Sequence, residues 1–346
     1  MAVTAYVTHP RYAEHTLAGH IESAARIQAV WRELDKAGLS ARMRALNPTL
    51  ADLDLVHAVH SPVYTQKLRR LTQSTDQVLL LNPDTYAGPA SFEIALLAAG
   101  GAVSAVDSVL AGQAANALAV VRPPGHHATA AGAMGFCLLA NVALAAHHAR
   151  RAFGLERVLI VDYDVHHGNG TQDAFYDDPD VLFVSTHQYP FYPGTGAFED
   201  TGAGVGRGFT VNLPLPAGHG DATYAALCDA IIWPLAQRFQ PQLIVVSAGF
   251  DAHWADPLGG MRLSLAGYAH LTRELIAMAA SLCDGKIVFV LEGGYNHGAL
   301  AHGVRNIAHL LLGDSAMSDP LGPAAAHAQP EAASIIAYAR RIHNLA

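Results

Sequence analysis

An apolar segment that ends abruptly in acidic and imidazole side chains constrains this chain more than any other feature. Residues 158–161 are Val, Leu, Ile and Val, and Asp162, Asp164 and His166 follow at every second position. Side chains alternate between the two faces of a strand, so we expect these three to point the same way. Ionisable groups at the end of a buried strand are costly unless a partner such as a metal ion satisfies them. The segment therefore predicts half of a metal site.

Two further apolar segments end in the same manner. Residues 243–250 lead to Asp251, and residues 119–125 lead through a Pro-Pro-Gly turn to His126 and His127. Ligands of open α/β sheets bind outside the carboxyl ends of the strands, so we expect these ends to converge. Asp164, His166 and Asp251 would then form a three-ligand set with open positions for water and substrate, as in catalytic zinc sites.

The alternation of apolar runs and helical segments predicts an α/β fold. Strands are expected at residues 2–8, 117–121, 158–162, 181–185, 210–213, 243–248 and 287–291. Helices are expected at residues 22–36, 62–71, 91–110, 137–149, 224–239, 265–282, 299–312 and 331–342. This order is typical of a parallel sheet covered by helices on both faces. We expect residues 1–346 to form a single catalytic domain.

Composition narrows the class of protein. The formal net charge is −8 and no Lys/Arg cluster stands out, which argues against a nucleic-acid partner. Residues 128–149 carry no charged side chain, but Gly, Asn and His interrupt them, so we expect a buried helix and no membrane contact. Three isolated cysteines suit a reducing compartment, and the first ten residues lack a basic signal-like region. We therefore expect a cytoplasmic protein.

The imidazole pair and one tyrosine are candidates for proton transfer. The turn before His126 and His127 would let both rings face the metal, where one could act as base and then as acid. Tyr295 follows a strand and two glycines, so its phenol could reach a developing oxyanion. Together with the metal set, these groups predict hydrolysis of an amide.

Six sequence blocks carry a resemblance to a known family. They are Arg122-Pro-Pro-Gly-His-His127, Gly135-Phe-Cys137, Val161-Asp-Tyr-Asp-Val-His-His-Gly-Asn-Gly-Thr-Gln172, Pro193-Gly-Thr-Gly196, Ser247-Ala-Gly-Phe-Asp251 and Leu291-Glu-Gly-Gly-Tyr295. In this order they resemble the zinc-dependent histone deacetylase family, and Asn169 with the Glu-Gly-Gly-Tyr run is similar to its class II branch and bacterial amidohydrolases. The resemblance implies an arginase-like three-layer α/β/α sandwich around an eight-stranded, mainly parallel sheet.

The resemblance also implies roles for the catalytic residues. The zinc ligands would be Asp164, His166 and Asp251. His127 would be the general acid and base, oriented by Asn169, whereas class I members have an aspartate at that place. His126, oriented by Asp162, would be its electrostatic partner. Tyr295 would donate a hydrogen bond to the carbonyl oxygen of the amide.

The family likeness further implies a substrate channel and monovalent cation sites. Phe136 and Tyr192 would form the walls of a narrow acyl-lysine channel lined by Gly135. One potassium ion would lie among Asp162, Asp164, His166, Ser185 and Thr186. A second would lie among Phe175, Asp178, Val181 and Phe209.

The substrate is less constrained than the chemistry. Leu258 occupies the place where polyamine-selective relatives carry an acidic gatekeeper, which favours removal of acetyl or other short acyl groups from lysine in a peptide or protein. Acetylpolyamines or another small amide are the second reading, and a non-catalytic acyl-ligand sensor is the third. A two-manganese ureohydrolase would need further strand-end carboxylates. The oligomeric state is open, and a homo-oligomer is compatible with the sequence.

Overall fold

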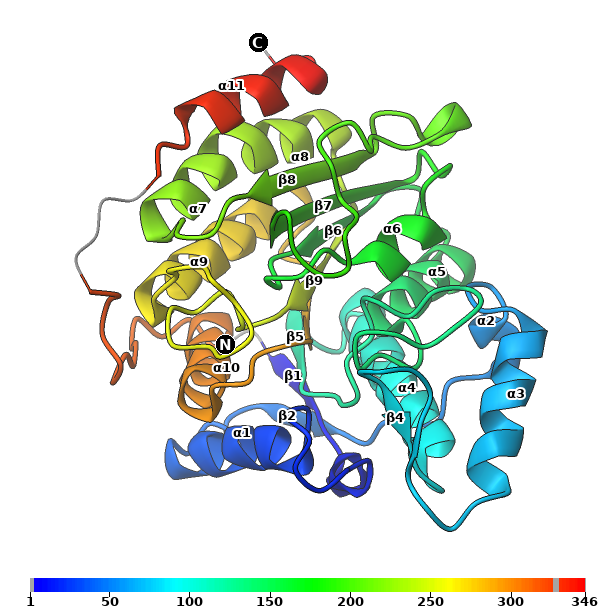
Figure 1. Cartoon of the computed structure of the whole chain (residues 1–346). Coiled ribbons are helices and arrows are strands. Elements are labelled where there is room, and N and C mark those ends of the chain that lie inside the picture. The colour runs from blue at the N-terminus through cyan, green and yellow to red at the C-terminus, as the bar shows by residue number, and fades with distance from the viewer. Residues whose placement is uncertain (1–2, 326–329, 346) are drawn as a thin grey trace.

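An eight-stranded parallel sheet forms the central layer of the computed structural model, which describes residues 3–325 and 330–345 (Figure 1). In spatial order the strands are β2 (Arg44–Leu46), β1 (Thr4–Val7), β5 (Asn116–Ala119), β10 (Ile287–Leu291), β9 (Leu243–Ala248), β6 (Val158–Asp162), β7 (Val181–Gln188) and β8 (Thr210–Leu215). Every neighbouring pair is parallel. Every residue of β6, β9 and β10 is buried, as expected for strands covered on both faces.

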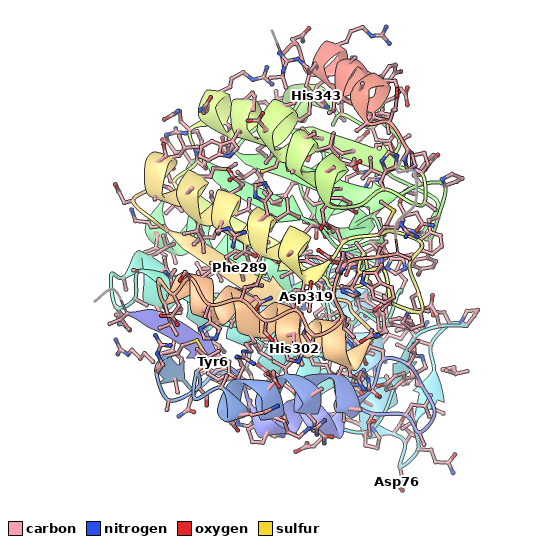
Figure 2. The ribbon with its side chains drawn as sticks, turned by 90° about the vertical axis from the view of Figure 1, so that its left-hand side faces the viewer. Tyr6, Asp76, Phe289, His302, Asp319 and His343 are labelled. Atoms are coloured by element: carbon pink, nitrogen blue, oxygen red, sulfur yellow. The ribbon has the colours of Figure 1, made fainter. Side chains whose placement is uncertain are left out.

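Helices cover both faces of this sheet. One layer contains α1 (Ala24–Lys36), α7 (Asp221–Leu227), α8 (Trp233–Phe239), α9 (Leu265–Leu282) and α10 (His297–Leu311). The other contains α4 (Ser91–Leu110) and α5 (Asn141–Phe153). Figure 2 shows α1, α10, α9 and α8 stacked side by side across the first face. The predicted α/β/α sandwich is therefore confirmed.

Several further elements lie outside the three layers of the sandwich. They are α2 (Leu53–Val56), α3 (Pro62–Gln73), α6 (Asn169–Ala174), α11 (Ala333–Ile342) and the antiparallel pair of β3 (Leu79–Leu80) and β4 (Tyr86–Ala87). The long apolar helix α4 could span a membrane by length and composition alone, but 72% of its most apolar window is buried inside the protein. Its burial identifies it as a core helix.

The boundaries differ from the predictions where side-chain pattern is a weak signal. Strand β2 was missed because it has three residues, none of them buried. Helix α5 begins four residues later than predicted, since Met134 and Cys137 form a small backbone bridge before it. The predicted helix 224–239 is instead divided by a π-helical turn, Cys228–Ile232. Local changes of this kind leave apolar periodicity almost unaltered.

A buried ion cluster ties the amino-terminal region to the sheet. The Glu22 carboxylate accepts two hydrogen bonds from the Arg122 guanidinium, at 2.6 and 2.7 Å, and one from Arg26 at 3.0 Å. Arg26 also donates to the carbonyl oxygens of Glu292 and Gly294, at 2.5 and 2.7 Å, in the loop after β10. All three charged side chains are buried. The cluster therefore fixes the loop that carries Tyr295.

Replacing Glu22 should show how much this cluster contributes to the free energy of unfolding. Glu22→Gln is expected to lower the free energy of unfolding at pH 7 by about 3–5 kcal/mol, because two buried guanidiniums lose their counter-charge. Burial by itself raises the pKa of the Glu22 carboxyl, but Arg122 and Arg26 lower it to about 2. The wild-type contribution should thus be present above pH 4.5, the ordinary value, and be lost as the pH falls towards 2.

Urea denaturation of both proteins at several pH values measures this difference. Glu93→Gln is the matched control, because Glu93 pairs with Arg11 at the exposed surface and should contribute little. Equal stability losses in the two variants would contradict the assigned role of the buried cluster.

Candidate metal centre and catalytic pocket

Asp164, His166 and Asp251 meet at the carboxyl ends of β6 and β9. The Nδ1 atom of His166 lies 3.1 Å from Asp164 Oδ1 and 3.2 Å from Asp251 Oδ2, and all three residues are buried. One potential ligand atom from each lies within 4.8 Å of the others. The structure therefore brings together the three residues predicted as metal ligands.

The local geometry differs from the expected strand alternation. Strand β6 ends at Asp162, so Asp164 and His166 lie in the following turn. The backbone N–H of Asp164 donates to Asp162 Oδ1 at 3.1 Å, and that of His166 donates to Asp164 Oδ1 at 3.0 Å. The prediction that one strand aligns all three side chains was thus wrong. Successive aspartate-stabilised turns place them instead.

Two glycines leave the space that these carboxylates occupy. A Cβ atom at Gly249 would lie 2.1 Å from Asp164 Oδ2, and one at Gly293 would lie 2.3 Å from Asp251 Oδ2. The backbone N–H of Gly293 also donates to Asp164 Oδ2 at 2.9 Å, while that of Val165 donates to Asp251 Oδ1 at 2.9 Å. The carboxylates are therefore held in place by close backbone approach.

The three side chains fit a cation. Among the described residues, Asp251 Oδ2 is buried without a hydrogen-bond partner. Burial and the charge of Asp164 raise the pKa of Asp251 to about 7. Burial alone would lower the pKa of His166, but the adjacent carboxylates of Asp164 and Asp251 raise it to about 9. Raised pKa values in such a cluster indicate excess negative charge, which a cation would neutralise. Two carboxylates and one imidazole suit a divalent metal ion that keeps open coordination positions.

The paired histidines lie beside this cluster, each with a different orienting group. The Nδ1 atom of His126 is 2.9 Å from Asp162 Oδ2, and that of His127 is 2.8 Å from Asn169 Oδ1. The ring centroids are 4.0 Å apart. Because the Asn169 amide nitrogen faces the His127 carbonyl oxygen at 3.4 Å, its Oδ1 is assigned as the acceptor from His127 Nδ1–H. Nε2 of His127 is then left as the basic nitrogen.

The surroundings push the proton affinities of the two rings apart. Burial would lower the pKa of His126, but Asp164 and Asp162 raise it well above its ordinary value. Burial, followed by the neighbouring His126 and His166, lowers the pKa of His127 well below its ordinary value. One ring is therefore suited to hold a proton beside the carboxylates, and the other to accept one.

A narrow pocket of about 200 Å³ leads to this centre. Its lining includes every residue predicted for substrate binding, namely Gly135, Phe136, Tyr192 and Leu258, together with Tyr295. The Phe136 ring contacts that of Tyr295 edge to face, with centroids 5.6 Å apart, and the Tyr192 ring meets His127 at 5.3 Å. Aromatic walls of this kind suit the methylene stem of an extended amine.

A strained turn in the pocket wall is held in position by a neighbouring loop. Gly135 and Phe136 have φ of +54° and +68°, a region that is uncommon for a residue such as Phe. The backbone N–H of Gly135 donates to Asp84 Oδ1 at 3.2 Å, and that of Phe136 donates to Thr85 Oγ1 at 3.1 Å. The segment between β3 and β4 therefore holds the Gly135–Phe136 turn in position.

Sequence reasoning missed three acidic residues of this region. Asp84 lines the pocket itself, but it lies in a short hairpin without a recognisable motif. Glu292 Oε2 accepts from the backbone N–H groups of Gly125 and His126, at 2.6 and 3.2 Å. Asp256 Oδ2 accepts from the N–H of Tyr295 at 2.6 Å. A carboxylate directly after a buried strand was the available signal for Glu292.

The residues predicted to bind potassium are distributed over two regions. In the first, Asp162 pairs with Ser185 across β6 and β7, and Thr186 Oγ1 donates to the Asp162 carbonyl oxygen at 3.4 Å. In the second, the Phe175 carbonyl oxygen accepts from Asp178 N–H at 3.1 Å. Val181 begins β7, and the Phe209 carbonyl oxygen accepts from Phe183 N–H in the same strand. Both sets remain predictions.

Comparison with known proteins defines the family. The model of the histone deacetylase domain matches residues 20–311. The chain is 41% identical to "Histone deacetylase 14, chloroplastic" of Arabidopsis thaliana over 96% of its length and 82% of that protein. It is 43% identical to human "Polyamine deacetylase HDAC10" over 88% of its length and 46% of that protein. The crystal structure of the HDA15 HD domain superposes with a TM-score of 0.88 at 34% identity, covering 99% of this chain and 94% of that one.

The parallel sheet and the strand-end cluster thus define a hydrolase of the arginase and deacetylase fold class. The chain belongs to the histone deacetylase family.

Substitution at Gly135 should separate catalytic geometry from folding. A Cβ atom there would lie 2.2 Å from the His127 ring, and the positive φ adds strain. Gly135→Ala is therefore expected to displace His127 and to reduce kcat/KM for an acetylated amine by about 100-fold, while the far-ultraviolet circular dichroism stays unchanged. Gly112→Ala, which has a similar φ but open space around it, is the control. Equal activity in the two variants would contradict the proposed contact.

Proposed function

We propose that this chain is a zinc-dependent amidohydrolase that removes acetyl or other short acyl groups from lysine side chains, with residues 1–346 forming one catalytic domain. The observation that carries the proposal is the buried cluster of Asp164, His166 and Asp251 beside two differently oriented imidazoles. When bound by these three residues, zinc would polarise the amide carbonyl and lower the pKa of a water molecule.

His127 would then move the proton. Its Nε2 atom would accept a proton from the attacking water and deliver it to the nitrogen of the leaving amine. Asn169 keeps Nδ1 protonated, as the 2.8 Å hydrogen bond allows. His126, held by Asp162, would keep its proton and place positive charge beside the charge that develops on the substrate oxygen.

Tyr295 would donate its hydroxyl hydrogen to the same oxygen. The backbone of this residue is anchored by Asp256, and the Arg26 guanidinium lies 4.8 Å from the centre of its ring. A phenol held from two sides needs little reorganisation when negative charge develops. This preorganised donor argues against the alternative of a non-catalytic acyl-ligand sensor.

Removal of one ligand tests the proposal directly. Asp251→Asn should abolish zinc retention, measured by inductively coupled plasma mass spectrometry, and hydrolysis of an acetyl-lysine peptide, because a neutral amide is a poor zinc ligand. A chelator should inactivate the wild type, and added zinc should restore it. Asp76→Asn is the control, since Asp76 is exposed at the periphery (Figure 2).

Two results would refute the proposed reaction. Full hydrolysis by a zinc-free preparation would show that the metal is not required. Stoichiometric binding of zinc and of an acyl-lysine peptide without turnover would identify a sensor.

An acetylpolyamine is the second candidate substrate, because the pocket contains an acidic side chain. Asp84 lines the pocket together with neutral Leu258, and its Oδ1 accepts hydrogen bonds from Thr85 and Gly135. A carboxylate held at this place would attract a cationic amine. The identity to a protein named polyamine deacetylase points in the same direction.

A substrate panel separates the two candidates. We expect higher kcat/KM for acetyl-lysine peptides than for acetylspermidine, because the apolar walls suit a lysine stem better than internal ammonium groups. Leu258→Glu should shift the ratio towards acetylspermidine by about three- to tenfold, and Asp84→Asn should shift it in the opposite direction. A wild-type preference for acetylspermidine of tenfold or more would refute the lysine assignment while leaving the zinc chemistry intact.

Three further expectations accompany this function. Potassium would bind at the two predicted carbonyl-rich sets as a structural or modulatory ion. The substrate would be the main partner, without nucleic acid or membrane contact, and a homo-oligomer is compatible with the proposal. We propose the cytoplasm as the location, from the isolated, unpaired spacing of the three cysteines.

A further inference from the structure

A second and larger pocket lies at the amino-terminal ends of the strands, whereas the candidate metal centre lies at their carboxyl-terminal ends. It has a volume of about 740 Å³, within the range of small-molecule sites. It is formed at the amino ends of β7 and β8 and by the residues that follow α11. The metal centre lies at the carboxyl ends of the strands, so the two pockets are separate.

The pocket carries uncompensated positive charge in a chain whose formal net charge is −8. Arg207 and Arg238 both line the pocket. Neither guanidinium has a carboxylate within 4.0 Å among the described residues. Two carboxylates also line it, but Asp180 is bound by Arg150 at 2.6 Å and Glu156 pairs with Arg157 at 3.5 Å. The remaining guanidiniums favour an anion.

One wall of the pocket is apolar and aromatic. The rings of Phe209 and Phe239 meet edge to face, with centroids 5.9 Å apart and an interplanar angle of 65°. Leu182, Leu235 and Ile342 complete this wall. A purely inorganic anion would leave this apolar wall in contact with water, so the wall favours a ligand with an organic body.

His343 lines the same pocket and connects it to the carboxyl-terminal segment. The residue is only 3% exposed. Its carbonyl oxygen accepts from Arg238 Nη1 at 2.8 Å, which fixes the residue at the end of α11 (Figure 2). The pocket is therefore bounded on one side by a carboxyl-terminal residue that is held in place by Arg238.

We propose that this pocket is a second ligand site, distinct from the hydrolytic centre, for a small amphipathic anion. The anionic group, a carboxylate, sulfonate or phosphate, would bind Arg207 and Arg238. The apolar or aromatic body would lie against Phe209 and Phe239. Such a ligand joins the sheet to the segment after α11 and stabilises their contact.

A matched pair of fluorescent probes tests the proposal on the whole protein. Anilinonaphthalene sulfonate carries two aromatic ring systems and one anionic group, and N-phenylnaphthylamine has the same rings without the charge. We expect saturable binding of the sulfonate at one site per chain and at least fivefold weaker binding of the neutral analogue. The sulfonate should also raise the unfolding temperature in a concentration-dependent manner.

Charge-matched variants locate the bound probe. Arg207→Gln should weaken sulfonate binding at least fivefold, and its fold is expected to persist because Arg207 is exposed. Arg151→Gln removes one exposed charge outside the pocket and should leave binding unchanged. Asp251→Asn should also bind the probe normally, since the metal centre is separate. Absence of saturable binding, equal affinity for the neutral analogue, or insensitivity to Arg207→Gln would overturn the proposal.

Discussion

The repulsion between two buried carboxylates is the constraint on which the rest of the site depends. Asp164 and Asp251 are completely buried and their oxygens converge on one imidazole, so the protein must supply positive charge, hydrogen bonds or both. Backbone N–H groups satisfy some of the oxygens, but Asp251 Oδ2 is left without a partner among the described residues. A divalent cation bound at this point, as we propose, would resolve the conflict and could act as a Lewis acid through the same interaction.

The outer groups of the site follow from that requirement. Glu292 fixes the backbone that presents the histidine pair, whereas Asp256 and Arg26 fix the Tyr295 loop. These contacts come from segments far apart in the chain, and they converge because the parallel strands all end at one edge of the sheet. A catalytic arrangement at the end of a parallel sheet thus obtains its rigidity from charged groups buried behind it and from glycines where backbone and side chain approach closely.

Much of the fold was predictable because its long, buried strands and helices can be recognised from the spacing of apolar residues along the sequence. Strands 158–162, 243–248 and 287–291 were predicted with their observed boundaries, since each is an apolar run that ends in polar or small residues. Helices 91–110 and 265–282 were also predicted without error. Short or irregular elements escaped, because neither the exposed strand β2 nor the π-helical turn at residues 228–232 alters apolar periodicity.

The candidate site likewise combines residues that local sequence pattern identifies with residues that it does not. The three residues proposed as metal ligands could be selected from their position after apolar strands, and the structure brings them together, but turns and not strand pleating align Asp164 with His166. Asp84 was missed because it enters the pocket through contacts with the Gly135 turn, which is 51 residues away in the sequence. Side chains that depend on such distant packing leave no spacing pattern to read.

X-ray diffraction from crystals grown with zinc, with data collected on both sides of the zinc absorption edge, can locate the metal. We expect one anomalous peak per chain, about 2.0–2.2 Å from a carboxylate oxygen of Asp164, Nδ1 of His166 and a carboxylate oxygen of Asp251. A zinc peak bound by other residues, or two metal ions sharing these carboxylates, would rule out the proposed one-zinc site.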